Sequence, residues 1–285
     1  MKEYLEIIKK ILVDGKEKKN RTGILGKSVT GHMFEYDMSS GKFPLLTTKF
    51  VSIKNVAVEL EGFIKGVTSK KWFQERGCHI WDDWCNPQKV PYGNDEETIK
   101  KMKEEDDLGL IYGSQWRDFK YPDMHTEGDG IDQLKTIVNK LKTNPTDRRM
   151  ICMAWNPLAL DYQALPPCHY SFQVLSDGTS VDLLWNQRSC DVPLGAPYNI
   201  ASYALLLKLI AKEVGMKEGK LIGFLADCHI YENQLEGIMT QIHRSPLELC
   251  ELDITNFTSI FDWTYKDIEL RDYKHHGKIV MPIAV

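Results

Sequence analysis

The amino-acid sequence predicts an α+β fold in which one large mixed β-sheet is flanked by helices. Helical and strand patterns both occur along the 285 residues, but they do not alternate in the strict order of a βαβ protein. Strand patterns are densest in the second half of the chain, on either side of a nearly all-apolar run at residues 201–214 that predicts a buried helix. We therefore expect residues 1–285 to form a single domain, which this length allows.

The N-terminal half combines helical spacing of apolar residues with a few strand-like runs. The expected elements are a helix around residues 4–12 that stops at Gly15, strands at 28–37 and 43–47, and helices at 53–64 and 131–141. The helix at 53–64 places two acidic residues, Glu59 and Glu61, among apolar neighbours. Of the two, Glu59 is the candidate for chemistry.

A charged insertion interrupts this half of the chain. Residues 86–107 are dense in Lys, Glu and Asp, a composition typical of a solvated excursion. We expect a helix at about 96–105 within it, and a second polar loop follows at 120–130. The insertion is too short to form a domain of its own.

The C-terminal half is expected to supply most of the sheet. Strands are predicted at 149–155, 169–175, 181–186 and 221–225, and helices at 201–214 and 231–243. Asp177-Gly178 favours a hairpin turn between two of the strands, because this pair tolerates positive φ. Gly215 is the expected end of the buried helix.

Composition and charge exclude several classes of protein. The formal net charge of −4 leaves no basic excess for general nucleic-acid binding, so a phosphate site would have to be a local arginine cluster. No apolar run approaches the ~18 residues of a membrane span, and the N-terminus lacks the features of a signal peptide. The seven cysteines are odd in number and form no Cys-x-x-Cys pair, which disfavours structural zinc and disulfides and indicates the cytoplasm.

Cys168 is the most informative residue. Pro166 and Pro167 hold the backbone extended before it, so the thiol is presented at the mouth of a turn. Arg188 lies in the segment 187–191, and a guanidinium near a thiol favours the reactive thiolate. The competing interpretation is a small buried hydrophobe, the usual state of a cysteine outside a disulfide.

A set of arginines in polar, turn-like segments suggests a phosphomonoester ligand, because Arg binds phosphate bidentately. The set consists of Arg21, Arg117, Arg148, Arg149 and Arg188. Arg148 and Arg149 are expected on a strand, where adjacent residues point to opposite faces, so this pair suits a sheet edge or an interface. Ordinary surface ion pairing is the alternative for each arginine.

Three further segments each have a functional and a structural interpretation. Asn199 offers a donor and an acceptor that match the N3–H and O4 edge of uracil, or it caps the helix that follows. Glu59 is either a buried proton shuttle with a raised pKa or a solvent-facing glutamate. His229 and Tyr231 suit a sugar hydroxyl, whereas an Asp227 helix cap would make His229 structural.

Taken together, these segments resemble the thymidylate synthase family over nearly the whole chain. The matching blocks are Phe43-Pro44-Leu45-Leu46-Thr47-Thr48-Lys49, Ile80-Trp81-Asp82, Ile111-Tyr112-Gly113, Gln115-Trp116-Arg117, Asp147-Arg148-Arg149, Leu165-Pro166-Pro167-Cys168-His169, Gln187-Arg188-Ser189-Cys190-Asp191 and Tyr198-Asn199-Ile200-Ala201-Ser202-Tyr203. The resemblance implies reductive methylation of dUMP to dTMP, with 5,10-methylenetetrahydrofolate leaving as dihydrofolate. It also implies an obligate homodimer whose sheets pack face to face. Neither metal nor flavin is required, because the folate supplies the hydride.

The resemblance also implies a role for each matching residue. Cys168 would add to C6 of the uracil, Glu59 would relay protons on the O4 side, and Asn199 would select uracil. Tyr112 and His169 would support the water that removes the C5 proton. The implied dUMP contacts are Arg21, Arg188, Ser189, His229 and Tyr231, together with Arg148 and Arg149 from the other subunit. The implied folate contacts are Ile80, Trp81, Trp84, Asp191, Leu194, Gly195 and Val285.

Some positions depart from the common pattern of the family. They are Phe50, Ser52, Glu61, Gly62, Asn186 and Ala226, and Gly62 stands where the family usually has a Trp. The nearest rival function is a dUMP hydroxymethylase on the same fold, which adds water instead of hydride. A Cys-His hydrolase and a non-catalytic nucleotide-binding module are rivals from other classes.

Overall fold

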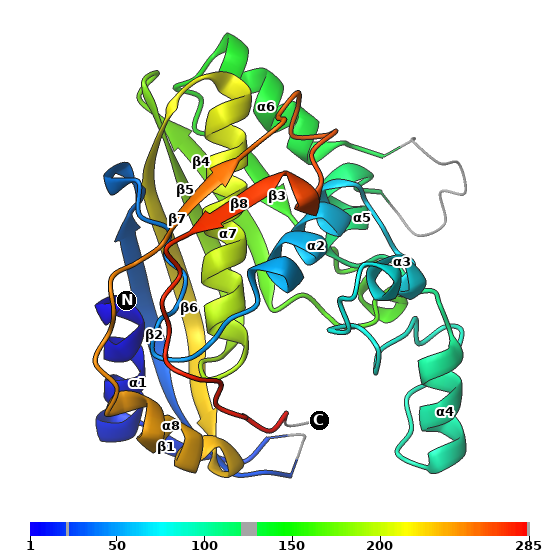
Figure 1. Ribbon diagram of the computed structural model, residues 1–285. Coiled ribbons are helices and arrows are strands. Elements are labelled where there is room, and N and C mark those ends of the chain that lie inside the picture. The colour runs from blue at the N-terminus through cyan, green and yellow to red at the C-terminus, as the bar shows by residue number, and fades with distance from the viewer. Residues whose placement is uncertain (21–22, 121–129, 284–285) are drawn as a thin grey trace.

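The computed structural model describes residues 1–20, 23–120 and 130–283 (Figure 1). Their main feature is a six-stranded mixed sheet with the order β1-β2-β6-β5-β4-β3. The strands are β1 (Lys16–Lys18), β2 (Gly26–Asp37), β3 (Ile151–Met153), β4 (His169–Ser176), β5 (Ser180–Asp191) and β6 (Lys217–Tyr231). The strands β5 and β6 run parallel, whereas the other neighbours run antiparallel. The predicted α+β class with a large mixed sheet is confirmed.

Helices flank this sheet, as the sequence predicted. They are α1 (Lys2–Asp14), α2 (Ile53–Ile64), α3 (Lys70–Glu75), α4 (Glu96–Glu104), α5 (Tyr112–Arg117), α6 (Gln133–Thr143), α7 (Gly195–Val214) and α8 (Leu235–Ile242). Short 3₁₀ turns are η1 (Met38–Ser40), η2 (Leu160–Tyr162), η3 (Glu232–Gln234) and η4 (Tyr265–Asp267). In Figure 1 the buried helix α7 runs along the sheet, and α4 of the charged insertion projects from the periphery. No helix in the described ranges is long and apolar enough to cross a bilayer.

The two faces of the sheet differ in their contacts. Along β5, alternate residues from Val181 to Gln187 are buried, and α7 packs against this strand. The register places Met33 opposite Phe224 on neighbouring strands. These two side chains are 56% and 43% exposed, and Ile151 on β3 is 47% exposed. One face is therefore covered by helices, while the other presents large apolar side chains.

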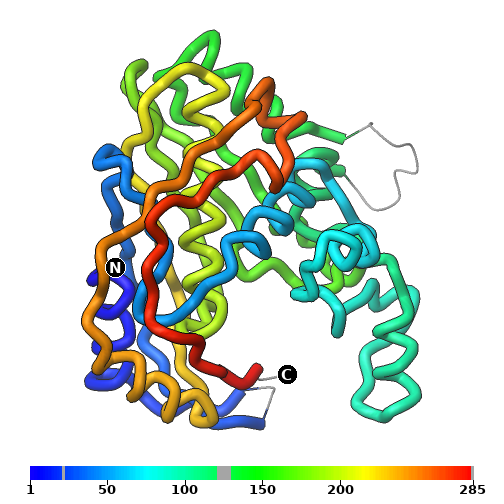
Figure 2. The backbone as a smooth tube through the Cα atoms, viewed as in Figure 1, coloured from blue at the N-terminus to red at the C-terminus, as the bar shows by residue number. Residues whose placement is uncertain are grey.

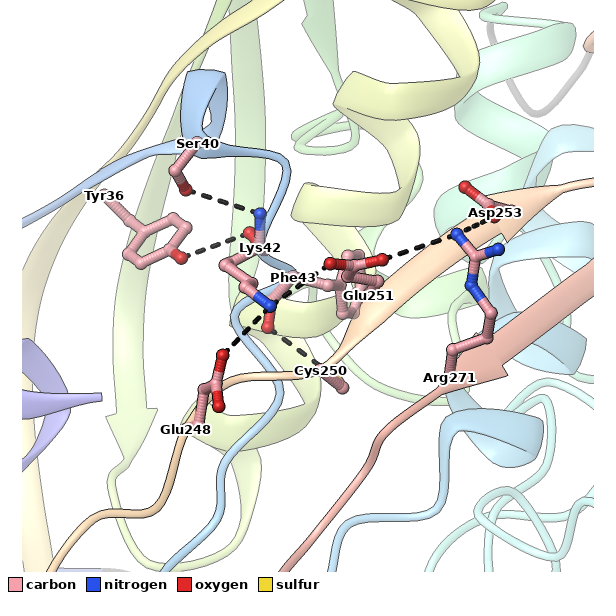
Figure 3. A network of polar contacts seen from close by, with 9 residues as sticks. All are labelled: Tyr36, Ser40, Lys42, Phe43, Glu248, Cys250, Glu251, Asp253 and Arg271. Atoms are coloured by element: carbon pink, nitrogen blue, oxygen red, sulfur yellow. Dashed lines mark hydrogen bonds and ion pairs between the residues drawn. The ribbon is translucent and has the colours of Figure 1, made fainter.

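The predicted strand at 43–47 is wrong, because the backbone bonds of this segment go elsewhere. The Phe43 N–H donates to the Cys250 carbonyl at 2.8 Å, and the Leu45 N–H turns back to the Phe43 carbonyl. Figure 3 shows the surrounding network, in which the Lys42 ammonium pairs with Glu248 and Glu251 at 3.2 and 3.1 Å. The buried apolar run is thus fixed as irregular chain against the segment that leads into β7 (Glu251–Ile254).

Several element bounds differ from the predictions, and three strands were not foreseen. The expected strands at 181–186 and 221–225 extend to β5 and β6, whereas the strand at 149–155 shortens to β3. The helix expected at 201–214 begins at Gly195, and the segment 231–243 starts as η3 before becoming α8. The missed strands are the short edge strand β1 and the pair of β7 with β8 (Ile268–Arg271), which forms a small antiparallel sheet. The helices at the N-terminus, at 53–64 and in the insertion are confirmed.

Candidate active site

The candidate site lies where the parallel strands β5 and β6 end. Their register pairs Ser189 with Asp227 and Asp191 with His229, so polar side chains from both strands meet at one edge. The neighbouring strand β4 begins just after Cys168, whose carbonyl accepts a 2.8 Å hydrogen bond from the Arg188 N–H. Carboxyl ends of parallel strands are a common location for ligand sites. The strand arrangement therefore brings together three segments that are far apart in the sequence.

Cys168 differs from the other cysteines in its exposure. All seven cysteines are reduced thiols, and six of them are buried while Cys168 is half-buried. Its backbone N–H donates to the Tyr112 hydroxyl at 2.7 Å, which fixes the turn before β4. The interpretation of Cys168 as a small buried hydrophobe is therefore wrong, because the residue is only half-buried.

Arg188 holds the proline turn that precedes this thiol. Its Nε donates to the Pro167 carbonyl at 3.0 Å, and its Nη2 donates to the Pro166 carbonyl at 2.8 Å. The guanidinium carbon lies 5.5 Å from the centre of the Trp155 ring. Two of the five guanidinium N–H groups thus orient the side chain, which remains exposed at the site edge. The guanidinium is thereby held on the carbonyls of the two prolines that directly precede Cys168.

The other candidate arginines occupy different surroundings. Arg148 and Arg149 lie in a turn before β3 and not on a strand, so the expectation of opposite strand faces is wrong. Arg149 bonds the Asp147 carboxylate at 2.9 and 3.0 Å, which lowers the pKa of that carboxyl, yet its side chain is 82% exposed. Arg117 has a structural role, because its Nε and Nη2 both donate to the Asp132 carboxylate. Arg21 lies outside the described residues.

An aromatic stack underlies the thiol. The ring centroids of Tyr112 and His169 are 4.2 Å apart, and the Phe63 ring stacks on Tyr112 at 5.0 Å. The Nδ1 of His169 lies 2.9 Å from the Tyr203 hydroxyl, and burial lowers the pKa of His169 to about 3. The imidazole is therefore neutral near pH 7 and too weak a base to hold a Cys-His ion pair. This observation argues against the hydrolase alternative that uses His169.

Glu59 is a buried carboxyl group that accepts a hydrogen bond from an indole. The side chain lies on α2, which Ser52 caps through a bond from the Asn55 N–H. The Trp81 indole N–H donates to Glu59 Oε1 at 3.1 Å. Burial raises the pKa of Glu59 from 4.5 to about 7. The solvent-facing alternative is wrong, and the carboxyl can gain and lose a proton near neutral pH.

Asn199 lies in the second turn of α7, and Leu194 is the N-cap of that helix, so the capping alternative is wrong. The Asn199 Oδ1 accepts from Gln187 Nε2 at 3.0 Å, and the Gln187 Oε1 accepts from the Trp185 indole N–H at 3.1 Å. This chain of bonds fixes the amide of Asn199. Sequence reasoning missed the orienting role of Gln187, because nothing in the local sequence indicates its contact with Asn199.

Asp191 follows Ser189 at the end of β5 and is largely surrounded by protein. Its carboxylate accepts from the Leu194 N–H at 3.0 Å and from Gln234 Nε2 at 3.1 Å. Burial raises the pKa of Asp191, while these two hydrogen bonds oppose that rise. Gly195 begins α7 directly after Leu194. Asp191, Leu194 and Gly195, three of the predicted folate residues, therefore lie together where β5 ends and α7 begins.

The remaining folate candidates lie in two parts of the chain, the turns after α3 and the C-terminal tail. Ile80, Trp81 and Trp84 lie in the turns after α3, where Trp81 is buried against Phe63 and Ile80 is exposed. The tail residue Val285 lies outside the described residues. Among these candidates, Trp81 is tied to Glu59 by its indole hydrogen bond.

His229 and Asp227 form a bonded pair at the end of β6. The Asp227 Oδ1 lies 3.1 Å from His229 Nδ1, and this bond holds the pKa of Asp227 down at about 2. Lys18 on β1 pairs with the same carboxylate. The Tyr231 ring lies 4.9 Å from the His229 ring, and Tyr231 is the N-cap residue of η3. Asp227 is therefore not the helix cap of the structural alternative.

The departures at Glu61 and Gly62 are accommodated by specific contacts. A Cβ on Gly62 would lie 2.3 Å from Phe73 Cε1, so the Phe73 ring fills the space that a larger side chain would need. Buried Glu61 accepts from Lys65 Nζ at 2.7 Å and from the Tyr265 N–H at 2.8 Å. Both residues therefore have defined contacts on the helix that carries Glu59.

Comparison with known proteins gives one consistent result. A family profile described as thymidylate synthase matches residues 2–285. The chain is similar to proteins named thymidylate synthase from Mesoplasma florum, at 43% identity over 298 residues, and Mycoplasma pneumoniae, at 40% over 297 residues. A third, from Mycoplasma genitalium, is 41% identical over 297 residues. Each alignment covers 100% of both chains.

Proposed function

The chain belongs to the thymidylate synthase family, and from this premise we propose that it methylates dUMP to dTMP with 5,10-methylenetetrahydrofolate. The folate donates both the one-carbon unit and the hydride and leaves as dihydrofolate. The observation that carries the proposal is the half-buried Cys168 at the edge where β5 and β6 end, beside the fixed guanidinium of Arg188.

Cys168 acts as the nucleophile. Its thiolate adds to C6 of the uracil, and the electron pair shifts toward C5 and O4. C5 then bonds the methylene carbon of the folate, one of whose two carbon–nitrogen bonds opens, and C5 afterwards loses its proton. Elimination of the folate leaves an exocyclic methylene, which accepts hydride as the sulfur departs. The Arg188 guanidinium beside the turn favours the thiolate that begins this sequence.

Glu59, Tyr112 and His169 handle protons in this scheme. Glu59 has a pKa of about 7, so it can donate toward O4 as charge develops there and take the proton back. The Tyr112 hydroxyl accepts from the Cys168 N–H and holds the turn in place. Neutral His169 stacks on Tyr112 and helps to position the water that takes the C5 proton.

Asn199 selects the base. The bond from Gln187 to Asn199 Oδ1 fixes the amide, so the Nδ2 group is directed as a donor for uracil O4. The second lone pair of Oδ1 is available for the N3–H of uracil. Cytosine has an amino group at the position of O4, so two hydrogen-bond donors, this group and Asn199 Nδ2, would face each other. His229 and Tyr231 bind the deoxyribose 3′-hydroxyl.

The phosphate site combines two copies of the chain. Arg21, Arg188 and Ser189 bind it from one subunit, and the exposed Arg148 and Arg149 reach it from the other. The open face of the sheet supports such a dimer, because exposed apolar side chains there, Met33 and Phe224 among them, call for a partner surface. The two sheets then pack face to face.

The folate packs against Ile80, Trp81, Trp84, Leu194, Gly195 and Val285, and Asp191 hydrogen-bonds the pterin. The described residues contain no group of three or more His, Cys, Asp or Glu arranged to hold a metal ion. The enzyme works in the cytoplasm.

Release of tritium from 5-tritiated dUMP tests the nucleophile. We expect folate-dependent release by the native chain and by Cys85→Ala, a buried thiol near the insertion, and none by Cys168→Ala. Release that persists in Cys168→Ala would exclude the proposed role. The product then separates methylation from hydroxymethylation, since only methylation yields dTMP and dihydrofolate together.

Mixed dimers test the shared phosphate site. A Cys168→Ala chain and an Arg149→Ala chain are each expected to be inactive alone. Their mixed dimer contains one site with a native Cys168 and a native Arg149, so it should recover about half of the native activity. Complete inactivity of the mixture would contradict the sharing.

A further inference from the structure

Tyr92, a residue of the charged insertion, contacts two segments that lie on different sides of the candidate site. Its hydroxyl donates to the Cys85 carbonyl at 3.0 Å and to the Ala164 carbonyl. Its ring meets the Trp84 ring edge to face, with the centroids 6.1 Å apart. Trp84 is a folate candidate, and Ala164 begins the segment that runs through two prolines to Cys168. One side chain of the insertion therefore joins the folate side of the site to the nucleophile side.

The segment around Ala164 bonds the insertion and its flank at further points. The Ala164 N–H donates to the carbonyl of Leu108, directly after the insertion, at 2.9 Å. Near the start of the insertion, Gln88 Nε2 donates to the Asp161 carbonyl at 2.9 Å. Ala164 is fully buried, and the Tyr92 hydroxyl supplies the donor that its carbonyl needs. The contact at Tyr92 is thus one part of a continuous interface.

The insertion is also attached firmly to the rest of the molecule. Its ends meet where the Asn86 N–H donates to the Asp107 carbonyl at 2.7 Å and the Asn86 Nδ2 donates to the Asp107 carboxylate at 2.9 Å. Lys70 is only 1% exposed, and its ammonium donates to the Met102 carbonyl of α4 at 2.7 Å and to the Asp82 carbonyl at 3.2 Å. Figure 2 shows the insertion at the edge of the molecule, away from the sheet. Tyr92 therefore belongs to an anchored part of the chain.

The nucleophile turn has its own attachment to the sheet. The Arg188 N–H on β5 donates to the Cys168 carbonyl at 2.8 Å, and the Arg188 side chain bonds the carbonyls of Pro166 and Pro167. The two prolines further restrict the backbone of this turn. The local setting of the thiol therefore does not depend on Tyr92. What the Tyr92 hydroxyl fastens is the folate-side turn at Cys85, which it holds against the nucleophile side.

We propose that Tyr92 is a positioning residue that sets the folate-side turn of Trp84 and Cys85 against the turn that carries Cys168. The inference rests on the proposed function, in which Trp84 packs against the folate and Cys168 holds the base. Carbon transfer requires C5 of the base to meet the methylene carbon of the folate. A small displacement of one binding surface relative to the other slows such a step. The charged insertion is thereby part of the machinery that aligns the two ligands.

The experiment compares Tyr92→Phe with Tyr162→Phe. The first variant keeps the ring beside Trp84 and removes the hydroxyl, while the second alters an exposed tyrosine of η2 near the same interface. In Tyr92→Phe, the kcat for folate-dependent release of tritium from 5-tritiated dUMP should fall about fivefold, the effect of one lost hydrogen bond. The Kd for dUMP should change less than about twofold. The control variant should change neither constant by more than about twofold.

Alkylation by iodoacetamide measures the thiol without folate. The reaction bonds the Cys168 sulfur to carbon and releases iodide, and mass spectrometry of the Cys168 peptide gives its rate. The rate and its pH dependence should agree within about twofold between the native enzyme and Tyr92→Phe. An unchanged kcat in Tyr92→Phe, even with a lower Tm, would overturn the proposal, and so would equal falls in kcat and in the alkylation rate. Absence of folate-dependent tritium release from the native enzyme would instead overturn the proposed function.

Discussion

Replacing Glu59 by glutamine should stabilise the protein at high pH while removing activity. The buried carboxyl has its pKa raised from 4.5 to about 7, so the folded state retains a proton that the unfolded chain releases. Stability from this group is fully present below pH 4.5 and is lost as the pH rises through 7. A glutamine never ionises, so it escapes that loss.

The magnitude follows from the difference between the two pKa values. At about 1.4 kcal/mol per pKa unit, the shift corresponds to roughly 3 kcal/mol. The Trp81 N–H can still donate to the amide oxygen of the substituted side chain, so no buried donor is orphaned. We expect Glu59→Gln to match the native free energy of unfolding near pH 4.5 and to exceed it by about 1–3 kcal/mol at pH 8.

Urea unfolding at fixed protein concentration, from pH 5 to pH 8, measures this difference. Glu61→Gln is the matched control on the same helix, because Glu61 is buried but bonded to Lys65 and to the Tyr265 N–H. It should lose about 1–3 kcal/mol near neutral pH. A stability gain for Glu59→Gln that does not grow with pH, or a net loss at pH 8, would refute the reasoning.

Two further substitutions probe base selection and the packing of α2. Asn199→Asp should shift binding from dUMP toward dCMP in competition assays, because a carboxylate cannot donate to O4, and unchanged discrimination would place the base elsewhere. Gly62→Ala should destabilise the protein by about 1–3 kcal/mol, because the new methyl group overlaps the Phe73 ring. Thermal unfolding measures the loss, which Phe73→Leu in the same chain should partly relieve. An additive loss in the double variant would contradict this packing.

The parts of the fold predicted well are those in which local pattern and tertiary packing agree. The helix at 53–64 has apolar residues at helical spacing and a Ser52 cap, and α2 has the same bounds. The buried helix ends as predicted at Gly215, which adopts a left-handed φ of 69°. In both cases the residues that favour a helix in isolation also face the core.

The failures arise where distant segments decide the structure. The run Phe43 to Thr47 has a strand composition, but its N–H groups bond residues of its own turn and the Cys250 carbonyl. The strand β5 continues through polar residues to Asp191, because β6 supplies a parallel partner that no local pattern reveals. Long-range pairing, and not propensity, sets those bounds.

The candidate site shows the same contrast between residues that local sequence marks and residues that long-range contacts define. Cys168 and Glu59 could be chosen from their sequence context, since a thiol after two prolines and an acid on an apolar helix both stand out. The residues that orient the site, Gln187 and Gln234, could not be chosen, because their roles depend on contacts with Asn199 and Asp191 far along the chain. Such glutamines look like ordinary polar residues until the strands are assembled.

Covalent trapping with 5-fluoro-dUMP and methylenetetrahydrofolate tests the central claim most directly. The fluorine at C5 cannot leave as a proton does, so the reaction should stop with the sulfur still bonded to C6 of the base and the folate carbon bonded to C5. Mass spectrometry of the denatured and digested protein should then find both ligands on the peptide that contains Cys168. An intact unmodified Cys168 peptide under these conditions, or an adduct on one of the other cysteines, would contradict the account.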